Sequence, residues 1–320
     1  MKKVVVLASV LGALFANSID KNVLYEGARV LEVSKKSDRI DEFNDIVYKQ
    51  VKTRDSVKEL HLSILAPQND TLKPAIIFYT GGGFQSASYH RFIQMRMALA
   101  EAGFVVVSAQ YRVIPDTFPA LIEDAKAAIR YVKAHAKEYG IDSKRIGILG
   151  DSAGGYVAQM MGLAKDKKYD VGENLNQNSQ VQAVATLYGI SNLLSIGEGF
   201  SKEVQEVHKS KAVTEALMLN GVAFKDFSGA AIDADEKKAL AASPLGNLDG
   251  KKPPFLIMHG DSDTLVSPMQ SKRLYVALRA KKIPVDYVVV KNAEHADDLW
   301  YQQVVFDEVI RFFKQNLTKK

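Results

Sequence analysis

From residue 67 onward, short apolar runs alternate with stretches of helical periodicity, and this alternation limits the possible folds more than any other feature of the chain. A run that is apolar throughout, instead of at every second position, is typical of a strand covered on both faces. Such strands separated by helices predict βαβ units and a mostly parallel sheet with helices on each side. The apolar runs are residues 75–79, 104–109, 146–149, 181–188, 255–258 and 285–290.

Two further strands are expected before these runs. Residues 42–52 and 57–65 show polar alternation and flank a turn at residues 53–56, which predicts an antiparallel hairpin at a sheet edge. With the hairpin, the sequence predicts an α/β fold with an eight-stranded sheet. The expected helices are residues 89–102, 120–139, 153–164, 268–281 and 299–315.

One connection is longer than a crossover needs, because residues 190–252 separate two predicted strands. Within it, residues 201–220 and 233–242 read as helices, with Ser201 and Asp233 as expected N-caps and Gly221 as a stop. We interpret the segment as a cap inserted over a cleft. Its aromatic residues can either line an acyl or aromatic pocket or pack within the cap; they include Phe200, Phe224 and Phe227.

The N-terminus has the pattern of a secretory signal peptide. Lys2 and Lys3 precede residues 4–16, which carry no charge, and Ala16-Asn17-Ser18 fits a small-x-small cleavage site. The alternative is a buried N-terminal strand or core helix. A membrane-spanning helix needs about 20 apolar residues, so no stable membrane anchor is expected. We therefore predict cleavage near Ser18, export to the periplasm or medium, and a single domain with its cap over residues 19–320.

Composition excludes several classes of function. The chain has no cysteine, so thiolate catalysis, Cys-ligated zinc and iron–sulfur clusters are excluded. Its net charge is +5; without residues 1–18 it has 40 basic and 37 acidic residues, or +3, with no block of like charges. Nucleic acid is therefore not an expected partner. No H-E-x-x-H pattern is present, and neither a metal nor a cofactor is predicted.

The strongest local signal is the G-x-S-x-G motif at residues 150–154, between a predicted strand and a predicted helix. In this context the motif predicts a sharp turn that exposes the hydroxyl of Ser152 as a nucleophile. The helix N-terminus behind it supplies backbone N–H groups where an oxyanion would form. The alternative is a tight strand-to-helix turn in which Ser152 is an ordinary N-cap.

A serine nucleophile needs a histidine base that is oriented by an acid. In this fold type both partners follow the serine along the chain, which leaves His208, His259 and His295 as candidate bases. His295 is favoured because it follows the last predicted strand, whereas His208 lies in a predicted helix and His259 ends a strand. Of the two carboxylates after that strand, Asp263 is favoured over Asp261, which is better placed to cap the turn.

Three glycines follow the strand at residues 75–79, in Thr80-Gly81-Gly82-Gly83. Without side chains, such a loop can turn backbone N–H groups toward an oxyanion. We expect the donors to be the amides of Gly82, Gly83 and Ala153. The alternatives are a flexible loop and a phosphate-binding nest, but no G-K-[ST] follows.

Together these motifs resemble the esterase/lipase group of the α/β-hydrolase superfamily, including feruloyl-esterase-like and acetyl-esterase-like bacterial enzymes. The resemblance extends from about residue 43 to the C-terminus and includes the G-D-S-A-G-G elbow and the H-G-x-x-D-x-x-V pattern at residues 259–266. It implies that Ser152 is the nucleophile, Asp263 the triad acid and His295 the base. Thr80 departs from the group, which usually has His before the glycines to brace the loop.

We therefore predict an exported serine esterase that cleaves a small or medium acyl ester through an acyl-enzyme. One alternative is a serine peptidase or amidase of the same fold. Another is a non-catalytic binding protein with an α/β-hydrolase fold. The sequence does not indicate the oligomeric state.

Overall fold

The structure is a computed structural model that describes residues 21–164 and 167–318. The chain divides into two units, residues 1–37 and 38–320. In the first unit the described part contains one short helix, α1 (Lys21–Tyr25). The predicted signal peptide, residues 1–18, lies outside the described residues. The second unit contains the sheet and all the candidate site residues.

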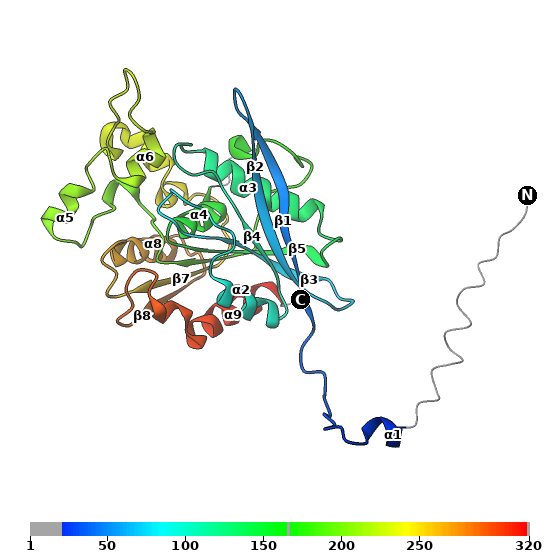
Figure 1. Ribbon diagram of the computed structural model, residues 1–320. Helices are drawn as coiled ribbons and strands as arrows, with labels where there is room; N and C mark the ends of the chain where they lie inside the picture. Colours follow the sequence, from blue (N-terminus) through cyan, green and yellow to red (C-terminus); the bar gives the residue numbers. More distant parts are fainter. Residues whose placement is uncertain (1–20, 165–166, 319–320) are drawn as a thin grey trace, which may run out of the picture. The chain divides into compact units, whose positions relative to one another are not determined.

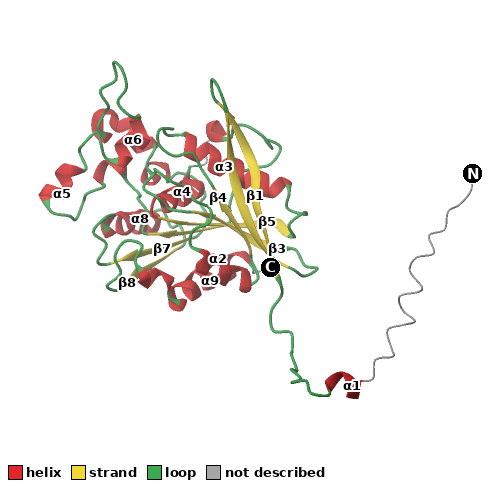
Figure 2. Cartoon of the chain, in the orientation of Figure 1, coloured by secondary structure: helices red, strands yellow, loops and turns green. Residues whose placement is uncertain are grey.

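Eight strands form one sheet in the second unit. Figure 2 draws the strands in yellow. They are β1 (Ile40–Lys52), β2 (Val57–Pro67), β3 (Lys73–Tyr79), β4 (Val105–Ala109), β5 (Ile141–Asp151), β6 (Ala183–Leu187), β7 (Phe255–Gly260) and β8 (Val285–Val290). Their order is β1-β2-β4-β3-β5-β6-β7-β8. Only the pairs β1–β2 and β2–β4 are antiparallel. The predicted eight-stranded, mostly parallel sheet with an edge hairpin is therefore confirmed.

Helices cover both faces of the sheet (Figure 1). One face carries α3 (Ala120–Ala134), α4 (Ser152–Leu163) and α8 (Pro268–Ala280), and the other carries α2 (Ile93–Glu101) and α9 (Gln303–Leu317). The strands divide their side chains between two cores in the same way. Ile77 of β3 joins the core with α3 and α4, while its neighbours Ile76 and Phe78 join the core with α2 and α9. This double burial explains the continuous apolar runs.

Several helix ends differ from the predictions. The helix predicted from residue 89 begins at Ile93, because Phe92 has φ 58, a left-handed conformation that a helix cannot include. The helix predicted from residue 299 is divided into a 3₁₀ turn, Asp298–Tyr301, and α9.

The insertion after β6 holds three short helices: α5 (Lys202–Val207), α6 (Thr214–Asn220) and α7 (Glu236–Ala241). Ser201 caps α5 through its side chain, and α6 stops at Gly221, as predicted. The predicted N-cap Asp233 is wrong: it lies in the preceding 3₁₀ turn, and Asp235 accepts the capping hydrogen bond from Lys238 N.

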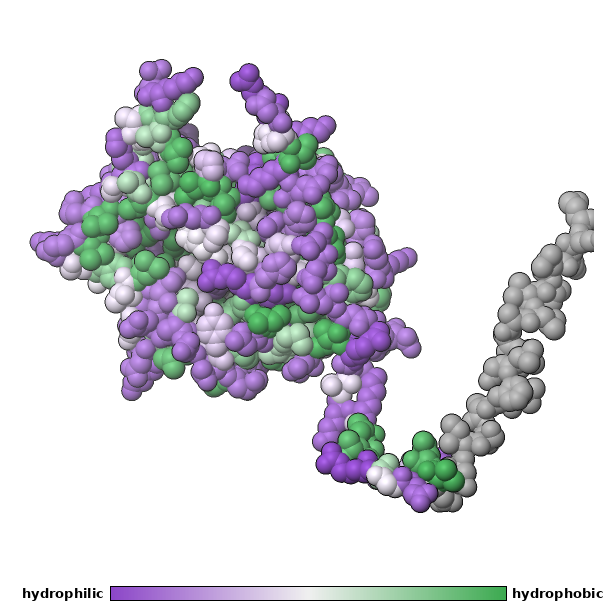
Figure 3. Space-filling model, viewed as in Figure 1, coloured by the Kyte–Doolittle hydropathy of each residue, from purple (hydrophilic) through white to green (hydrophobic). Residues whose placement is uncertain are grey.

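Apolar side chains gather on the surface of the insertion in the view of Figure 3. Phe224 is 70% exposed and Phe227 41% exposed, so neither is packed into an interior. Within the described part of the chain, no helix is both long and apolar enough to cross a membrane.

Candidate active site

Ser152 lies at the sharp turn where β5 ends and α4 begins. Its φ is 51, in the left-handed region that strains a residue with a side chain. The turn needs both glycines of the motif. A Cβ on Gly150 would lie 2.1 Å from Gly154 O, and a Cβ on Gly154 would lie 1.9 Å from Tyr79 O. Close packing of the elbow against β3 therefore allows no side chain at either position.

The structure brings the three side chains of the predicted triad together. Ser152 Oγ is 2.9 Å from His295 Nε2, and His295 Nδ1 is 2.7 Å from Asp263 Oδ2. The serine follows β5, the aspartate follows β7 and the histidine follows β8, so all three lie at the carboxyl edge of parallel strands. This geometry allows the imidazole to accept a proton from the hydroxyl while the carboxylate fixes its tautomer.

The carboxylate of Asp263 is held on both oxygens. Oδ1 accepts hydrogen bonds from Leu265 N and Val266 N, both at 2.9 Å. Oδ2 accepts the hydrogen bond from His295 Nδ1 and also lies 3.2 Å from Nε2 of the buried His259. Burial by itself would raise the pKa of Asp263, but the hydrogen bonds from His259 and His295 outweigh it and hold the pKa well below its ordinary value. Asp263 is therefore ionised and rigid at neutral pH.

The glycine loop lies directly against the elbow. A Cβ on Gly81 would approach Asp151 Oδ2 to 2.7 Å and Ser152 Cβ to 2.9 Å. Gly82 has φ 150 and Gly83 has φ 58, backbone conformations that favour glycine. Ala153 is in the first turn of α4, next to Ser152. The three amides that we predict as oxyanion donors thus belong to two segments in contact beside the serine hydroxyl.

Comparison with known proteins agrees with this architecture. The family model described as BD-FAE matches residues 62–278. The chain belongs to the BD-FAE family. The predicted membership of the α/β-hydrolase esterases is confirmed, and with it the fold.

Two relatives of this BD-FAE member are named as a probable carboxylic ester hydrolase and an esterase. The probable carboxylic ester hydrolase LipM of Mycobacterium tuberculosis is 30% identical over 204 residues, 63% of this chain and 44% of LipM. Esterase LipQ of the same organism is 30% identical over 71% of this chain and 51% of LipQ. The chain spans about half the length of these curated relatives.

Solved structures of esterases share the fold along most of the chain. A truncated carbohydrate esterase from gut microbiota has a TM-score of 0.74 at 24% identity, covering 89% of this chain and 99% of that one. A thermophilic esterase, Est2 of Thermogutta terrifontis, has a TM-score of 0.65 at 25% identity, and the match covers 88% of this chain and 92% of Est2.

In this BD-FAE member, contacts from three segments hold the glycine loop. Thr80 Oγ1 donates to Ser88 O at 3.0 Å, and the Tyr111 hydroxyl donates to Thr80 O at 2.8 Å. Gly81 N donates to Oδ1 of Asp151 at 2.9 Å. Thr80, where the group usually has His, is thus itself part of the bracing of the loop.

Asp151 was not among the residues that the sequence singled out, although it directly precedes the nucleophile. Burial raises the pKa of its carboxyl to about 6, against the hydrogen bond from Gly81 and the electrostatic effects of Arg91 and His295. Tyr188 and Trp300 were missed as well. The Tyr188 ring lies 4.8 Å from the His295 ring and 4.4 Å from Trp300, so the two rings support the histidine.

The competing candidates lie elsewhere. Asp261 was expected to cap its own turn, but the backbone hydrogen bond that its Oδ1 accepts, at 2.6 Å, comes from Asn292 N in the segment after β8. The buried His259 bonds Ser271 Oγ and Val266 O, as expected for a structural residue, but its proximity to Asp263 was not foreseen. His208 ends α5 and stacks on Phe200 in the insertion.

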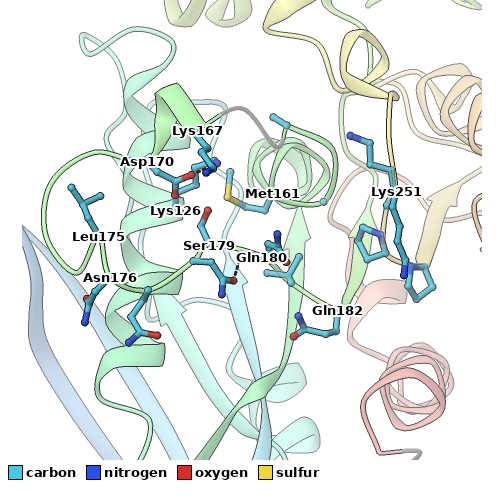
Figure 4. Close-up of a pocket in the computed structure, with 18 residues that line it drawn as sticks. Lys126, Met161, Lys167, Asp170, Leu175, Asn176, Ser179, Gln180, Gln182 and Lys251 are labelled. Carbon is cyan, nitrogen blue, oxygen red and sulfur yellow. Dashed lines mark hydrogen bonds and ion pairs between the residues drawn. The ribbon is translucent and has the colours of Figure 1, made fainter.

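A cavity of about 820 Å³ lies at the amino ends of the parallel strands, at the other end of the strands from the triad (Figure 4). Residues that precede β6 and β7 line it, including Gln182 and Pro254, together with Met161 from the end of α4. Half of the 18 residues that line it are asparagines, glutamines and lysines. Lys126 pairs with Asp170 there at 2.9 Å. It holds none of the triad residues. Among the described residues, no cluster of three or more His, Cys, Asp or Glu side chains could hold a metal ion.

Proposed function

We propose that the protein is a serine carboxylesterase that cleaves esters with a small or medium acyl group. The hydrogen-bonded chain from Ser152 through His295 to the ionised Asp263 carries this proposal. Relatives named as carboxylic ester hydrolase and esterase support the type of bond. The strained backbone of Ser152 supports its role as nucleophile, because strain of this kind collects at functional residues.

In the first half of the reaction, Ser152 Oγ attacks the ester carbonyl carbon while His295 Nε2 accepts the hydroxyl proton. A C–O bond forms to the serine, and the carbonyl oxygen becomes an oxyanion that the amides of Gly82, Gly83 and Ala153 stabilise. The tetrahedral intermediate then breaks its bond to the alcohol oxygen, and His295 returns the proton to that oxygen. The alcohol leaves and an acyl-enzyme remains on Ser152.

In the second half, water takes the place of the alcohol. His295 accepts a proton from water as its oxygen attacks the acyl carbon, and the second tetrahedral intermediate breaks its bond to Ser152 Oγ. The proton returns to the serine, and the carboxylic acid leaves. Asp263 remains ionised throughout and holds Nδ1 of His295 protonated.

The test compares hydrolysis of 4-nitrophenyl acetate by the wild-type protein and by Ser152→Ala. We expect the variant to lose roughly three or more orders of magnitude in kcat, since only oxyanion stabilisation and binding remain. Ser56→Ala, a change in the exposed turn between β1 and β2, is the matched control and should keep full activity. Equal rates for the wild-type protein and Ser152→Ala would contradict the proposal.

The class of bond and the acyl length need two further measurements. A matched 4-nitrophenyl ester and 4-nitroanilide of the same acyl group distinguish an esterase from an amidase or peptidase. Esters from acetyl to octanoyl report the acyl length that the site accepts. A dominant anilide activity, or absence of fluorophosphonate labelling of the folded protein, would replace the proposal by one of its alternatives.

We also propose that the protein is exported and that residues 1–18 are removed. The charged start, the uncharged run at residues 4–16 and the small residues before the cut support this. Intact-mass measurement after expression with the leader should give a chain that begins after Ser18. A chain of full-length mass recovered from the cytoplasm would contradict export.

A further inference from the structure

Arg91 lies where the glycine loop and the segment that carries His295 meet. Its backbone N donates a hydrogen bond to Ser88 O at 3.3 Å. The same carbonyl accepts the hydrogen bond from the Thr80 hydroxyl of the glycine loop. The next residue, Phe92, places its ring 4.7 Å from the ring of Tyr301, which follows His295 along the chain. Backbone and ring contacts on both sides therefore fix the position of Arg91.

The positive charge of Arg91 acts on groups beside the triad. Its positive charge lowers the pKa values of Asp151, Tyr188 and Tyr301, against the larger effect of burial, which raises them. Asp151 directly precedes the nucleophile, and Tyr188 contacts the ring of His295. Arg91 itself is exposed. An exposed cationic side chain thus acts on groups beside the triad.

Arg91 is unusual among the arginines of this unit. Of the ten arginines in residues 38–320, eight form an ion pair with a carboxylate, and the exceptions are Arg91 and Arg279. Arg279 lies in the last turn of α8, where a positive charge is favourable. Arg91 precedes α2, and a positive charge before a helix N-terminus is unfavourable. Asp298, which also influences Tyr301, makes no ion pair with Arg91 in the described structure.

We propose that Arg91 binds a carboxylate on the substrate, so that the protein prefers esters that carry a carboxylate group near the scissile bond. This inference rests on the proposed esterase function. A guanidinium offers parallel N–H donors that match the two oxygens of a carboxylate. No carboxylate of the described chain forms an ion pair with Arg91, and its charge lies before a helix N-terminus, where it is unfavourable. Arg91 is then a specificity-determining residue and takes no part in proton transfer.

The test measures kcat/KM for two pairs of esters that differ in charge. The first pair, 4-acetoxybenzoate and 4-acetoxybenzamide, varies the charge on the alcohol side. The second pair, 4-nitrophenyl hydrogen adipate and 4-nitrophenyl hexanoate, varies it on the acyl side. Measurements at about pH 8 and low salt keep the carboxylates ionised and poorly screened.

In Arg91→Gln we expect kcat/KM for the anionic member of at least one pair to fall about tenfold, while both neutral esters stay within about twofold. Arg91→Lys should keep part of the preference, since the charge remains and the paired donors do not. High salt should reduce the preference of the wild-type protein and leave Arg91→Gln unchanged. Arg54→Gln, at an exposed turn of the β1–β2 hairpin, makes the same change in net charge away from the site and should behave as wild type.

The outcomes separate this inference from the proposed function. If the wild-type protein hydrolyses none of the four esters, the esterase proposal fails, and the inference fails with it. If it hydrolyses them and Arg91→Gln lowers the rates for anionic and neutral esters equally, the esterase proposal stands and the inference is wrong. In that case Arg91 acts through its effect on Asp151 and the glycine loop.

Discussion

Replacing Asp151 by Asn removes a buried charge beside the nucleophile and keeps an acceptor for Gly81 N. In the wild-type protein Asp151 is half-buried, and its carboxylate accepts one backbone hydrogen bond from the glycine loop at 2.9 Å. The side-chain oxygen of Asn can accept the same bond, because an amide oxygen has two lone pairs. The variant therefore tests the energetic effect of the charge with little change in shape.

The magnitude follows from the shift in the pKa of Asp151. Burial raises it from the ordinary value of 3.8 to about 6 in the folded protein. As pH rises, the unfolded chain loses this proton first, so the free energy of unfolding falls between pH 3.8 and 6 and stays low above that. At about 1.4 kcal/mol per pKa unit, the ionised carboxylate costs about 3 kcal/mol at pH 8 and about 1 kcal/mol at pH 4.5.

Denaturant unfolding of wild type and Asp151→Asn from pH 4.5 to 8 measures this effect. The stability of the variant relative to wild type should increase by about 2 kcal/mol across that range and level off above about pH 7. The matched control is Asp55→Asn, because the carboxylate of Asp55 is 86% exposed in the β1–β2 turn. The difference in unfolding free energy between this variant and wild type should not change with pH. A pH-independent difference for Asp151→Asn would refute the assignment of a destabilising buried carboxylate.

Two further variants test the elbow and the triad acid. Gly154→Ala places a Cβ 1.9 Å from Tyr79 O and should destabilise the fold by roughly 3 kcal/mol or more, seen as a lower thermal midpoint; an unchanged midpoint would contradict the packing. Asp263→Asn should lower kcat roughly 10⁴-fold on 4-nitrophenyl acetate, and retention of activity would exclude Asp263 as the triad acid. Because the folded pKa of Asp263 is depressed, its stabilisation is present above the unfolded pKa of 3.8 and is lost as pH falls, so the stability lost in Asp263→Asn should shrink below about pH 4.

The strands and the residues that follow them could be predicted because one physical requirement decides both. A parallel strand buried on two faces must be apolar along its length, and helices must cover it. The carboxyl ends of such strands share one edge, so residues that directly follow β5, β7 and β8 had to meet there. Position after a strand therefore favoured His295 and Asp263 over the other candidates.

The details that the sequence did not predict depend on single contacts between distant segments. Helix α2 starts late because Phe92 adopts φ 58 and packs on Tyr301, more than two hundred residues away in sequence. Asp151 holds the glycine loop through one hydrogen bond, from Gly81 N, and His259 acts on the triad through one contact, 3.2 Å from Asp263 Oδ2. Neither residue type nor periodicity carries information about such contacts, whose energy is realised only when the sheet has formed.

The glycine loop explains how this chain can have Thr80 where the esterase group usually has His. The loop backbone is held at Thr80 O by Tyr111, at Gly81 N by Asp151 and, through the threonine hydroxyl, at Ser88 O. Two of these three contacts use backbone atoms of the loop, which any residue at position 80 would present. The bracing is therefore distributed over three segments of the fold and uses no imidazole at position 80. None of these three contacts uses the side chain of Arg91, so the loop would stay held by Ser88, Tyr111 and Asp151 if that side chain bound a substrate carboxylate as we propose.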